Sequence, residues 1–305
     1  MASALPADAR RAKWRAALLS VALTGGSVGV KGAVALVTGS SAILAETAHS
    51  FSDLLAAVIA LLAVRAADRP PDPNHPFGHQ KLEHVSAVVE GLILIAVAGF
   101  VVVQAARSFG DPVENSALGI AVMAVSAGAS FFVARRVSRV ARASHSAALE
   151  ADSAHIAADV WSSVGTAAAL LVIGLTGWNE VDAIFGIAVS AWVAATGGRL
   201  ALNGLRVLID ESVSSDDLEL IRSALEEARP AGVLSYHRLR ARRSGATRHV
   251  DVHVVVDPGM TVREAHVITD EIERSIEDRL PAADVVVHVE PAGTEPEADA
   301  AFGLA

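Results

Sequence analysis

Residues 43–64 read Ile-Leu-Ala-Glu-Thr-Ala-His-Ser-Phe-Ser-Asp-Leu-Leu-Ala-Ala-Val-Ile-Ala-Leu-Leu-Ala-Val, a mostly apolar stretch that contains a few ionisable residues. A helix needs about 20 mainly apolar residues to cross the core of a bilayer, and this stretch is long enough. Five other segments approach that length: Ala16–Val37, Val85–Val103, Ala117–Val133, Leu149–Leu175 and Val181–Leu202. The sequence therefore predicts an α-helical membrane protein with six transmembrane helices.

The composition of the chain favours the same class. Of its 305 residues 52% are hydrophobic and 19% are charged, and the mean hydropathy is +0.43, whereas soluble domains carry more charge. The net charge of −9 argues against nucleic acid as a partner. Because the chain has no cysteine, any transition-metal site must use histidine and carboxylate ligands.

Positive charge is divided unevenly between the two ends of the predicted spans. Three short connections, at Gly39-Ser40, residues 111–115 and residues 177–180, contain no lysine or arginine. The opposite ends carry these cations: Arg10, Arg11, Lys13, Arg15, Arg65, Arg69, Lys81, Arg135, Arg136, Arg139 and Arg142. By the positive-inside rule both termini are cytoplasmic, and no removable signal peptide is predicted. The compact loops favour a bacterial cytoplasmic (inner) membrane.

After residue 208 the apolar spans give way to a mixed pattern of helices and strands. A helix is predicted from Ser214 to Arg229, and a second one, with a capping-box sequence, from Thr261 to Leu280. Strands are predicted at Tyr236–Arg242, Arg248–Val256 and Asp284–Glu290. The order αββαβ predicts a small α+β domain with two helices on one face of a sheet. The chain therefore divides into a transmembrane domain (1–208), a cytoplasmic domain (209–292) and a flexible tail (293–305).

The second and fifth spans contain the same arrangement of ionisable residues. Each has an acid, a histidine three residues later and an aspartate four residues beyond, as in His49–Asp53 and His155–Asp159. These offsets place the groups on one helical face, and ionisable groups inside a membrane mark a cavity or a pathway. Two such pairs, brought face to face, supply two nitrogens and two oxygens, a tetrahedral set that Zn²⁺ accepts and that differs from the oxygen shells of Mg²⁺ and Ca²⁺.

The other ionisable residues in the spans leave more than one role open. Glu46 and Asp152 lie on the same helical faces as these pairs, toward the start of each motif. Glu46 could bind the ion, pair with Lys31 or relay protons, and Asp152 could bind the ion or lie outside its coordination shell. Glu90 in the third span is interpreted as a structural or vestibule-lining residue.

The paired HxxxD motifs resemble the transport site of the cation diffusion facilitator (CDF) family, in particular its YiiP-like bacterial zinc/proton antiporters. The resemblance implies that His49, Asp53, His155 and Asp159 bind the transported ion. It also implies a secondary transporter rather than an enzyme, with no organic cofactor. His49 stands where these transporters usually carry an aspartate, which favours zinc over manganese or iron.

The loop from Asp72 to Glu83 is similar to the family's signature between the second and third spans. The resemblance implies a second metal site formed by Asp72, His75 and His79, although the loop by itself could also be a turn with surface histidines. Lys81 and Asp210 match a charged pair that interlocks two protomers of a homodimer in the family. Each could otherwise be an ordinary charge at a helix end.

The last third of the chain resembles the family's metallochaperone-like cytoplasmic domain, which binds metal and dimerises. The residues that match its metal-binding positions are His237, His253, His266, His288 and Glu290. The resemblance therefore implies regulatory Zn²⁺, and histidines beside one acid suit a binuclear site with a bridging carboxylate. Glu290 replaces the usual aspartate, so the site is expected to be weaker, to hold one ion, or to serve only as a dimer contact.

The sequence thus predicts proton-coupled efflux of a divalent transition-metal cation, Zn²⁺ before others, by alternating access. The expected partners are the metal ion, protons, the lipid bilayer and a second copy of the chain. An exporter of Co²⁺, Cd²⁺, Ni²⁺ or Fe²⁺ stays open, since intrinsic affinity does not set selectivity in cells. A membrane metal sensor leaves the duplicated motifs unexplained. An intramembrane zinc hydrolase lacks an HExxH motif and an open coordination position.

Overall fold

The computed structural model describes residues 7–38, 41–107, 109, 117–178, 180–280 and 282–293. The chain divides between Leu208 and Ile209 into a helical bundle and a smaller unit of helices and strands. The connections predicted at residues 39–40 and 111–115 and all but the first residue of the predicted tail lie outside the described residues.

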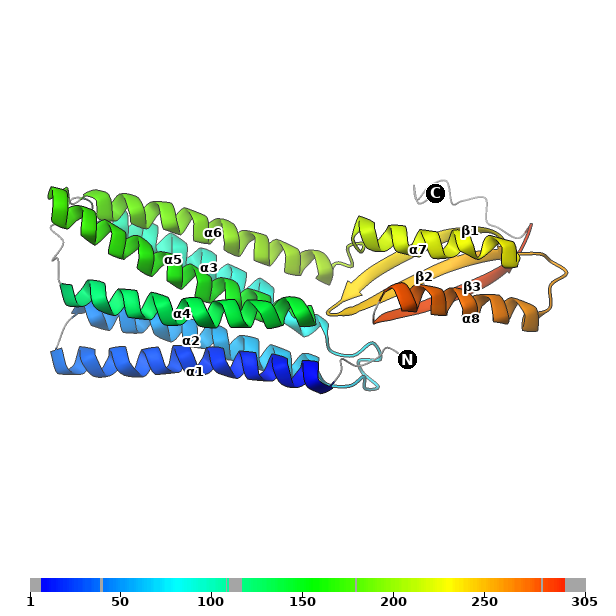
Figure 1. Cartoon of the computed structure of the whole chain (residues 1–305), viewed down its shortest axis with the longest axis horizontal. Coiled ribbons are helices and arrows are strands. Elements are labelled where there is room, and N and C mark those ends of the chain that lie inside the picture. Colours follow the sequence, from blue (N-terminus) through cyan, green and yellow to red (C-terminus); the bar gives the residue numbers. More distant parts are fainter. Residues whose placement is uncertain are drawn as a thin grey trace. The chain divides into compact units, whose positions relative to one another are not determined.

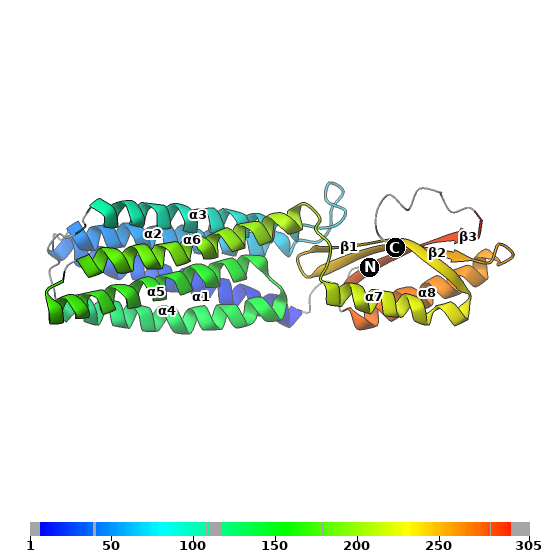
Figure 2. The same ribbon diagram turned by 90° about the horizontal axis from the view of Figure 1, so that it is seen from above.

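The bundle consists of long helices that run side by side (Figures 1 and 2). These are α1 (Ala7–Thr38), α2 (Ser41–Ala67), α3 (Lys81–Arg107), α4 (Ala117–Ser144), α5 (Ala147–Thr176) and α6 (Glu180–Leu208). Each is longer than its predicted span, because polar residues continue the helical turns beyond the apolar stretch. The arginine-rich end of α4, for example, extends the helix from Val133 to Ser144. Helix α5 contacts each of the other five helices, so its side chains reach the interior of the bundle.

Helices α3 and α6 approach each other closely at glycines. A Cβ atom added at Gly91 would lie 2.5 Å from the carbonyl oxygen of Gly197, and one added at Gly197 would lie 2.7 Å from that of Gly91. A third contact, at Gly204, would place a Cβ 2.9 Å from the carbonyl oxygen of His84. Small residues at helix crossings allow backbones to approach in a membrane, where packing drives association.

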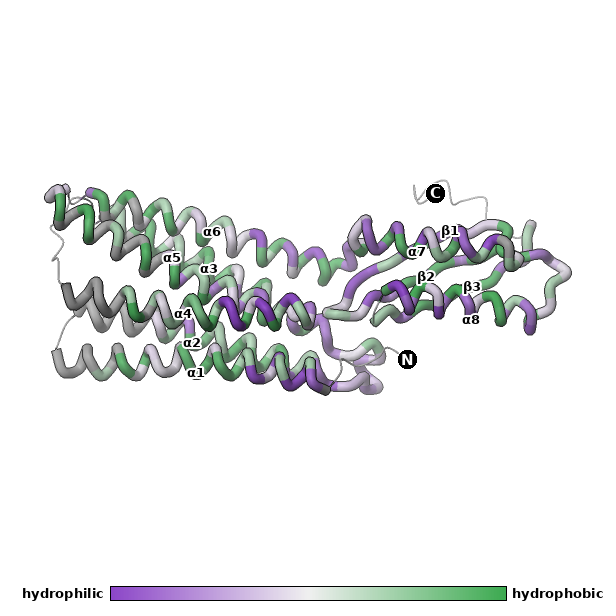
Figure 3. The backbone as a smooth tube through the Cα atoms, viewed as in Figure 1, coloured by the Kyte–Doolittle hydropathy of each residue, from purple (hydrophilic) through white to green (hydrophobic). Residues whose placement is uncertain are grey.

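Hydrophobic residues predominate along the helices of the bundle, and hydrophilic residues gather at the end where α1 begins and α4 ends (Figure 3). Among the described residues, α3 meets the length and composition of a membrane span. The exposed apolar side chains include Leu62, Phe100 and Phe132. Lipid solvates such side chains, so their exposure fits a membrane domain.

The smaller unit has one three-stranded sheet, β1 (Val233–Ser244), β2 (Thr247–Val256) and β3 (Ala283–Pro291), in the order β1-β2-β3. Strands β1 and β2 are antiparallel, and β2 and β3 are parallel. The helices are α7 (Ser215–Glu227) and α8 (Val262–Arg279), with a short 3₁₀ turn, η1 (Arg229–Ala231), between α7 and β1. The predicted order αββαβ is therefore present.

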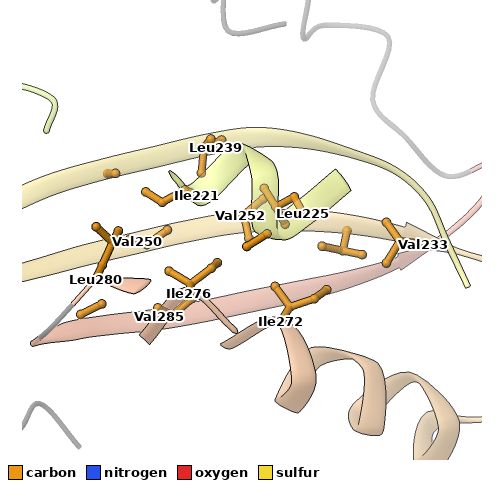
Figure 4. Packing of buried hydrophobic residues seen from close by; sticks show 14 of the residues in the cluster. Ile221, Leu225, Val233, Leu239, Val250, Val252, Ile272, Ile276, Leu280 and Val285 are labelled. Carbon is orange, nitrogen blue, oxygen red and sulfur yellow. The ribbon is translucent and has the colours of Figure 1, made fainter. Parts of the chain in front are cut away.

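Both helices pack on one face of the sheet around a single apolar core (Figure 4). Val250, Val252 and Val254 alternate along β2 toward this core, where Ile221 of α7 and Ile272 of α8 meet them. The other face of the sheet thus receives the intervening residues of β2. Helix α8 begins as predicted with a capping box between Thr261 and Glu264.

A bulge in β1 decides which of its residues face the core. The pairing register shifts between His237 and Arg240, and Arg238 has a left-handed φ of 52°. An extra residue reverses the alternation of the side chains that follow it. His237 therefore shares a face with His253, with which it is paired, while Leu239 turns into the core.

Candidate metal sites

Helices α2 and α5 bring the predicted transport residues together inside the bundle. His155 Nε2 lies 2.9 Å from Asp53 Oδ1, and Asp53, His155 and Asp159 each offer a ligand atom within 4.8 Å of the others. Asp53 and His155 are 6% and 3% exposed. His49 lies one turn before Asp53 on α2, but its side chain is outside the described residues, as are those of Glu46 and Lys31. The arrangement offers one imidazole and two carboxylates to a single cation.

Two further acids are buried beside this group. Asp152 accepts a hydrogen bond of 2.8 Å from Ser20 of α1, and Glu90 of α3 accepts one of 2.6 Å from Ser86. Glu90 is completely buried, and the two carboxyl groups interact electrostatically. Asp152 lies about one turn from His155 along α5, so the acids extend the polar interior from the metal site toward the end of the bundle where α5 begins.

The end of the bundle where α1 begins contains a buried ionic cluster that the sequence analysis missed. Lys13 of α1 is 3% exposed and forms ion pairs with Glu83 of α3 and, at 3.5 Å, with Asp68 near the end of α2. Ser146, just before α5, donates a 2.5 Å hydrogen bond to Glu83. Lys13 had been grouped with the cations that flank the spans. The available signal was its position three residues before an apolar segment, with Asp68 and Glu83 also within four residues of segment ends.

The loop between α2 and α3 gathers Asp72, His75 and His79. Their ligand atoms lie within 4.8 Å of one another, and Asp72 Oδ1 and Oδ2 lie 3.1 and 3.3 Å from ring nitrogens of His75 and His79. The backbone N–H groups of Asn74 and His75 also donate to Asp72. Desolvation acts to raise the pKa of Asp72, but the hydrogen bonds from His75 and Asn74 outweigh it and lower the pKa. The carboxylate is therefore ionised and available to a cation at neutral pH.

The open face of the sheet carries a third group. His237, His253 and His288 are cross-strand neighbours on β1, β2 and β3. Glu290 Oε2 lies 3.1 Å from His237 Nε2, and Glu290 Oε1 lies 2.7 Å from His253 Nδ1 and 3.5 Å from His288 Nε2. Desolvation acts to raise the pKa of Glu290, but the hydrogen bonds with His253 and His237 outweigh it and lower the pKa. The one acid thus contacts all three histidines.

Three predicted residues lie outside these groups. His266 lies on α8, which covers the opposite face of the sheet, and its Nδ1 is 3.5 Å from Asp270. Asp210 accepts a hydrogen bond of 3.2 Å from Arg242 within the smaller unit. Lys81 is the first residue of α3, in the bundle. The interlock of Lys81 and Asp210 between protomers therefore stays a prediction.

Comparison with known proteins places this arrangement in a family. Residues 17–209 match the cation efflux transmembrane domain, and residues 213–292 match the cytoplasmic domain of cation efflux proteins. The chain belongs to the cation diffusion facilitator family. The family resemblance and the fold class predicted from the sequence are thereby confirmed, and the chain is an integral membrane cation transporter, not an enzyme.

Curated relatives of this CDF transporter cover nearly its whole length. An uncharacterized transporter of Synechocystis sp. is 32% identical over 90% of this chain and 89% of its own. The cation-efflux pump FieF of Yersinia pestis is 29% identical over 95% of this chain and 97% of its own. The metal cation as substrate and the dimeric state follow from the two matched domains.

Solved structures that resemble this CDF transporter cover part of its chain. The zinc form of the transporter CzrB is 34% identical and covers 28% of this chain and 98% of its own, with a TM-score of 0.27. The metal-bound C-terminal domain of CzcD from Thermotoga maritima is 29% identical and covers 28% of this chain and 100% of its own, with a TM-score of 0.25.

Proposed function

We propose that this transporter exports Zn²⁺ from the bacterial cytoplasm in exchange for protons, and that Asp53, His155 and Asp159, together with His49, hold the ion. The observation that carries the proposal is the 2.9 Å approach of His155 to Asp53, with Asp159 within ligand distance, inside a cation efflux domain. Mixed nitrogen and oxygen donors suit zinc, and hard cations such as Mg²⁺ prefer oxygen alone.

Proton exchange follows from the chemistry of these ligands. Zinc binds neutral imidazole and ionised carboxylate, so binding releases any protons that the site holds. Unperturbed imidazole titrates near pH 6.5, so a more acidic external side supplies protons that compete with the metal. Rocking of the helices between inward- and outward-facing states would then exchange one cargo for the other.

The loop group and the group on the sheet are proposed to bind regulatory metal. Asp72, His75 and His79 would form a second site on the cytoplasmic side, and His237, His253, His288 and Glu290 would form a site in the cytoplasmic domain. A metal ion in the cytoplasmic domain would have ligands on all three strands of the sheet. Lys81 and Asp210 are proposed to interlock the two protomers, with both termini in the cytoplasm of an inner membrane.

Proton coupling and metal choice can be tested together in proteoliposomes with an imposed pH gradient. We expect uptake of Zn²⁺ to be accompanied by proton movement in the opposite direction, reported by an internal pH dye. A panel of Co²⁺, Cd²⁺, Ni²⁺ and Fe²⁺ ranks the competing substrates, and His49→Asp should shift the ranking away from zinc. Zinc uptake that is indifferent to the gradient would refute the antiport mechanism.

A further inference from the structure

A second feature of the bundle lies outside the proposed ion path. Arg10, Arg11 and Trp14 of α1 and Asp68 near the end of α2 line a cavity of about 310 Å³. The guanidinium of Arg65 lies over the Trp14 ring, with its Cζ 5.5 Å from the ring centroid. The cavity thus combines an aromatic wall with two cationic side chains of α1, and Arg65 of α2 lies beside it on the Trp14 ring.

The charge around this cavity is unbalanced. Arg10, Arg11 and Arg65 are exposed, and among the residues that the structure describes no carboxylate forms an ion pair with them. Asp68 is the acid that lines the cavity, and its Oδ1 is already 3.5 Å from the buried Lys13. Lys13 is in turn held by Glu83. Arg10 and Arg11 therefore share the cavity with one carboxylate that already pairs with Lys13, and Arg65 adds a third cation beside Trp14. Positive charge is in excess here, so the cavity suits an anion.

The depth of these residues matches the headgroup region of a bilayer. Arg11 precedes Ala16, the first residue of the predicted apolar segment, by five positions, which is about 7.5 Å along a helix. The polar region of one leaflet is roughly 5–8 Å thick. Arg65 directly follows Val64, where the second apolar segment ends. Tryptophan is also enriched at this boundary.

We propose that this cavity binds the phosphate of an anionic glycerophospholipid in the cytoplasmic leaflet. The planar guanidinium of arginine can donate two parallel hydrogen bonds to phosphate oxygens, and Arg10 and Arg11 place two such groups at the cavity. Trp14 provides an apolar surface next to the phosphate for the glycerol backbone. The inference goes beyond the transport of metal and depends only on the cytoplasmic placement of this end of α1.

The test uses Trp14 as a fluorophore in the full-length protein. A variant with Trp161→Phe, Trp178→Phe and Trp192→Phe retains Trp14 alone and is placed in phosphatidylcholine nanodiscs. Phosphatidylglycerol brominated near the headgroup is expected to quench Trp14 more strongly than brominated phosphatidylcholine at equal mole fraction. Loss of each arginine should reduce this preference about fivefold. Arg10→Gln/Arg11→Gln and Arg65→Gln provide independent variants if one of them folds poorly.

Arg135→Gln/Arg136→Gln is the matched control, because it removes two exposed arginines of α4 that do not line the cavity. It should leave the preference for phosphatidylglycerol intact. Equal quenching by the two lipids, or an equal loss in the control, would overturn the proposal. Competition by inorganic phosphate would also overturn it, since the site would then take a soluble anion. No outcome depends on zinc transport, so this inference and the proposed function fail separately.

Discussion

At the scale of single residues, the placement of Lys13 shows how strongly context changes a charged side chain. It lies in the same polar segment as Arg10 and Arg11, yet the bundle buries it between Glu83 and Asp68. A buried cation is tolerated only with partners, and removal of one member leaves the others without compensation. The cluster joins α1, α2 and α3 and, through Ser146, the start of α5.

Replacement of this lysine should therefore destabilise the whole bundle. Lys13→Met is expected to lower the free energy of unfolding by about 3–5 kcal/mol, because Glu83 is left buried without a cation. Thermal unfolding in detergent measures the effect. Arg136→Met, which removes an exposed cation from α4, should change stability by less than about 1 kcal/mol. Equal melting temperatures for the two variants would show that the ionic cluster contributes nothing.

At the same scale, the candidate transport site shows what one sequence can and cannot reveal. The offsets in the two HxxxD motifs indicated which residues share a helical face, and the structure does bring Asp53, His155 and Asp159 within ligand distance. The hydrogen bonds of Ser20 to Asp152 and of Ser86 to Glu90 could not be predicted, because they depend on how the helices are rotated against each other. The roles of Asp53, His155 and Asp159 as metal ligands stay a prediction.

At the scale of elements, the contact between α3 and α6 rests on glycine. Gly91→Ala would place a methyl group 2.5 Å from the carbonyl oxygen of Gly197, so the helices must separate. We expect a loss of about 1–3 kcal/mol, typical of overpacking. Gly99→Ala lies on the same helix with no atom within 4 Å of the added Cβ and should be neutral or slightly stabilising. Thermal unfolding of both variants in detergent decides the point. Equal stability of the two variants would contradict the close approach of α3 and α6 at Gly91.

The capping box of α8 predicts a dependence on pH. Hydrogen bonds from Thr261 lower the pKa of Glu264. A carboxyl group with a lowered pKa contributes stability above its unfolded pKa of about 4.3, and that contribution is lost as the pH falls through the folded value. The first turn of α8 should therefore exchange its amide hydrogens faster, after correction for intrinsic rates, at the acid end of this window.

Glu264→Gln separates this effect from general acid unfolding. Glutamine can still accept the hydrogen bond from Thr261 but has no charge to lose. The difference in exchange between wild type and variant should vanish below the folded pKa. A difference that is constant with pH would contradict the role assigned to the carboxylate.

The strands illustrate which local features sequence alone conceals. The alternating pattern of Arg248–Val256 predicted the strand β2, and the capping box predicted the start of α8. The bulge at Arg238 was not predicted, because no glycine marks it and the left-handed conformation is held by the surrounding pairing. Without the bulge, Leu239 would share the face of His237, and one of them would be misplaced.

At the scale of the whole molecule, hydropathy and charge were sufficient to predict a six-helix membrane domain followed by a small α+β domain. Both were predictable because the bilayer demands long apolar helices and an abrupt change in composition follows them. The family match over residues 17–209 and 213–292 confirms this fold class. His266 lies on α8, across the sheet from His237, His253 and His288, so its role as a metal ligand stays a prediction.

Asp53, His155 and Asp159 are proposed to hold the exported ion. The initial rate of zinc uptake by proteoliposomes under a fixed pH gradient tests this assignment, with Asp159→Asn compared with Glu150→Gln. Both changes remove one carboxylate from α5, but Glu150 is exposed and lies outside the group. Loss of a direct ligand should exceed the roughly 10–100-fold cost known for outer-shell partners. We predict a near-complete loss of uptake for Asp159→Asn and a wild-type rate for Glu150→Gln, whereas a wild-type rate for a folded Asp159→Asn protein would contradict the assignment.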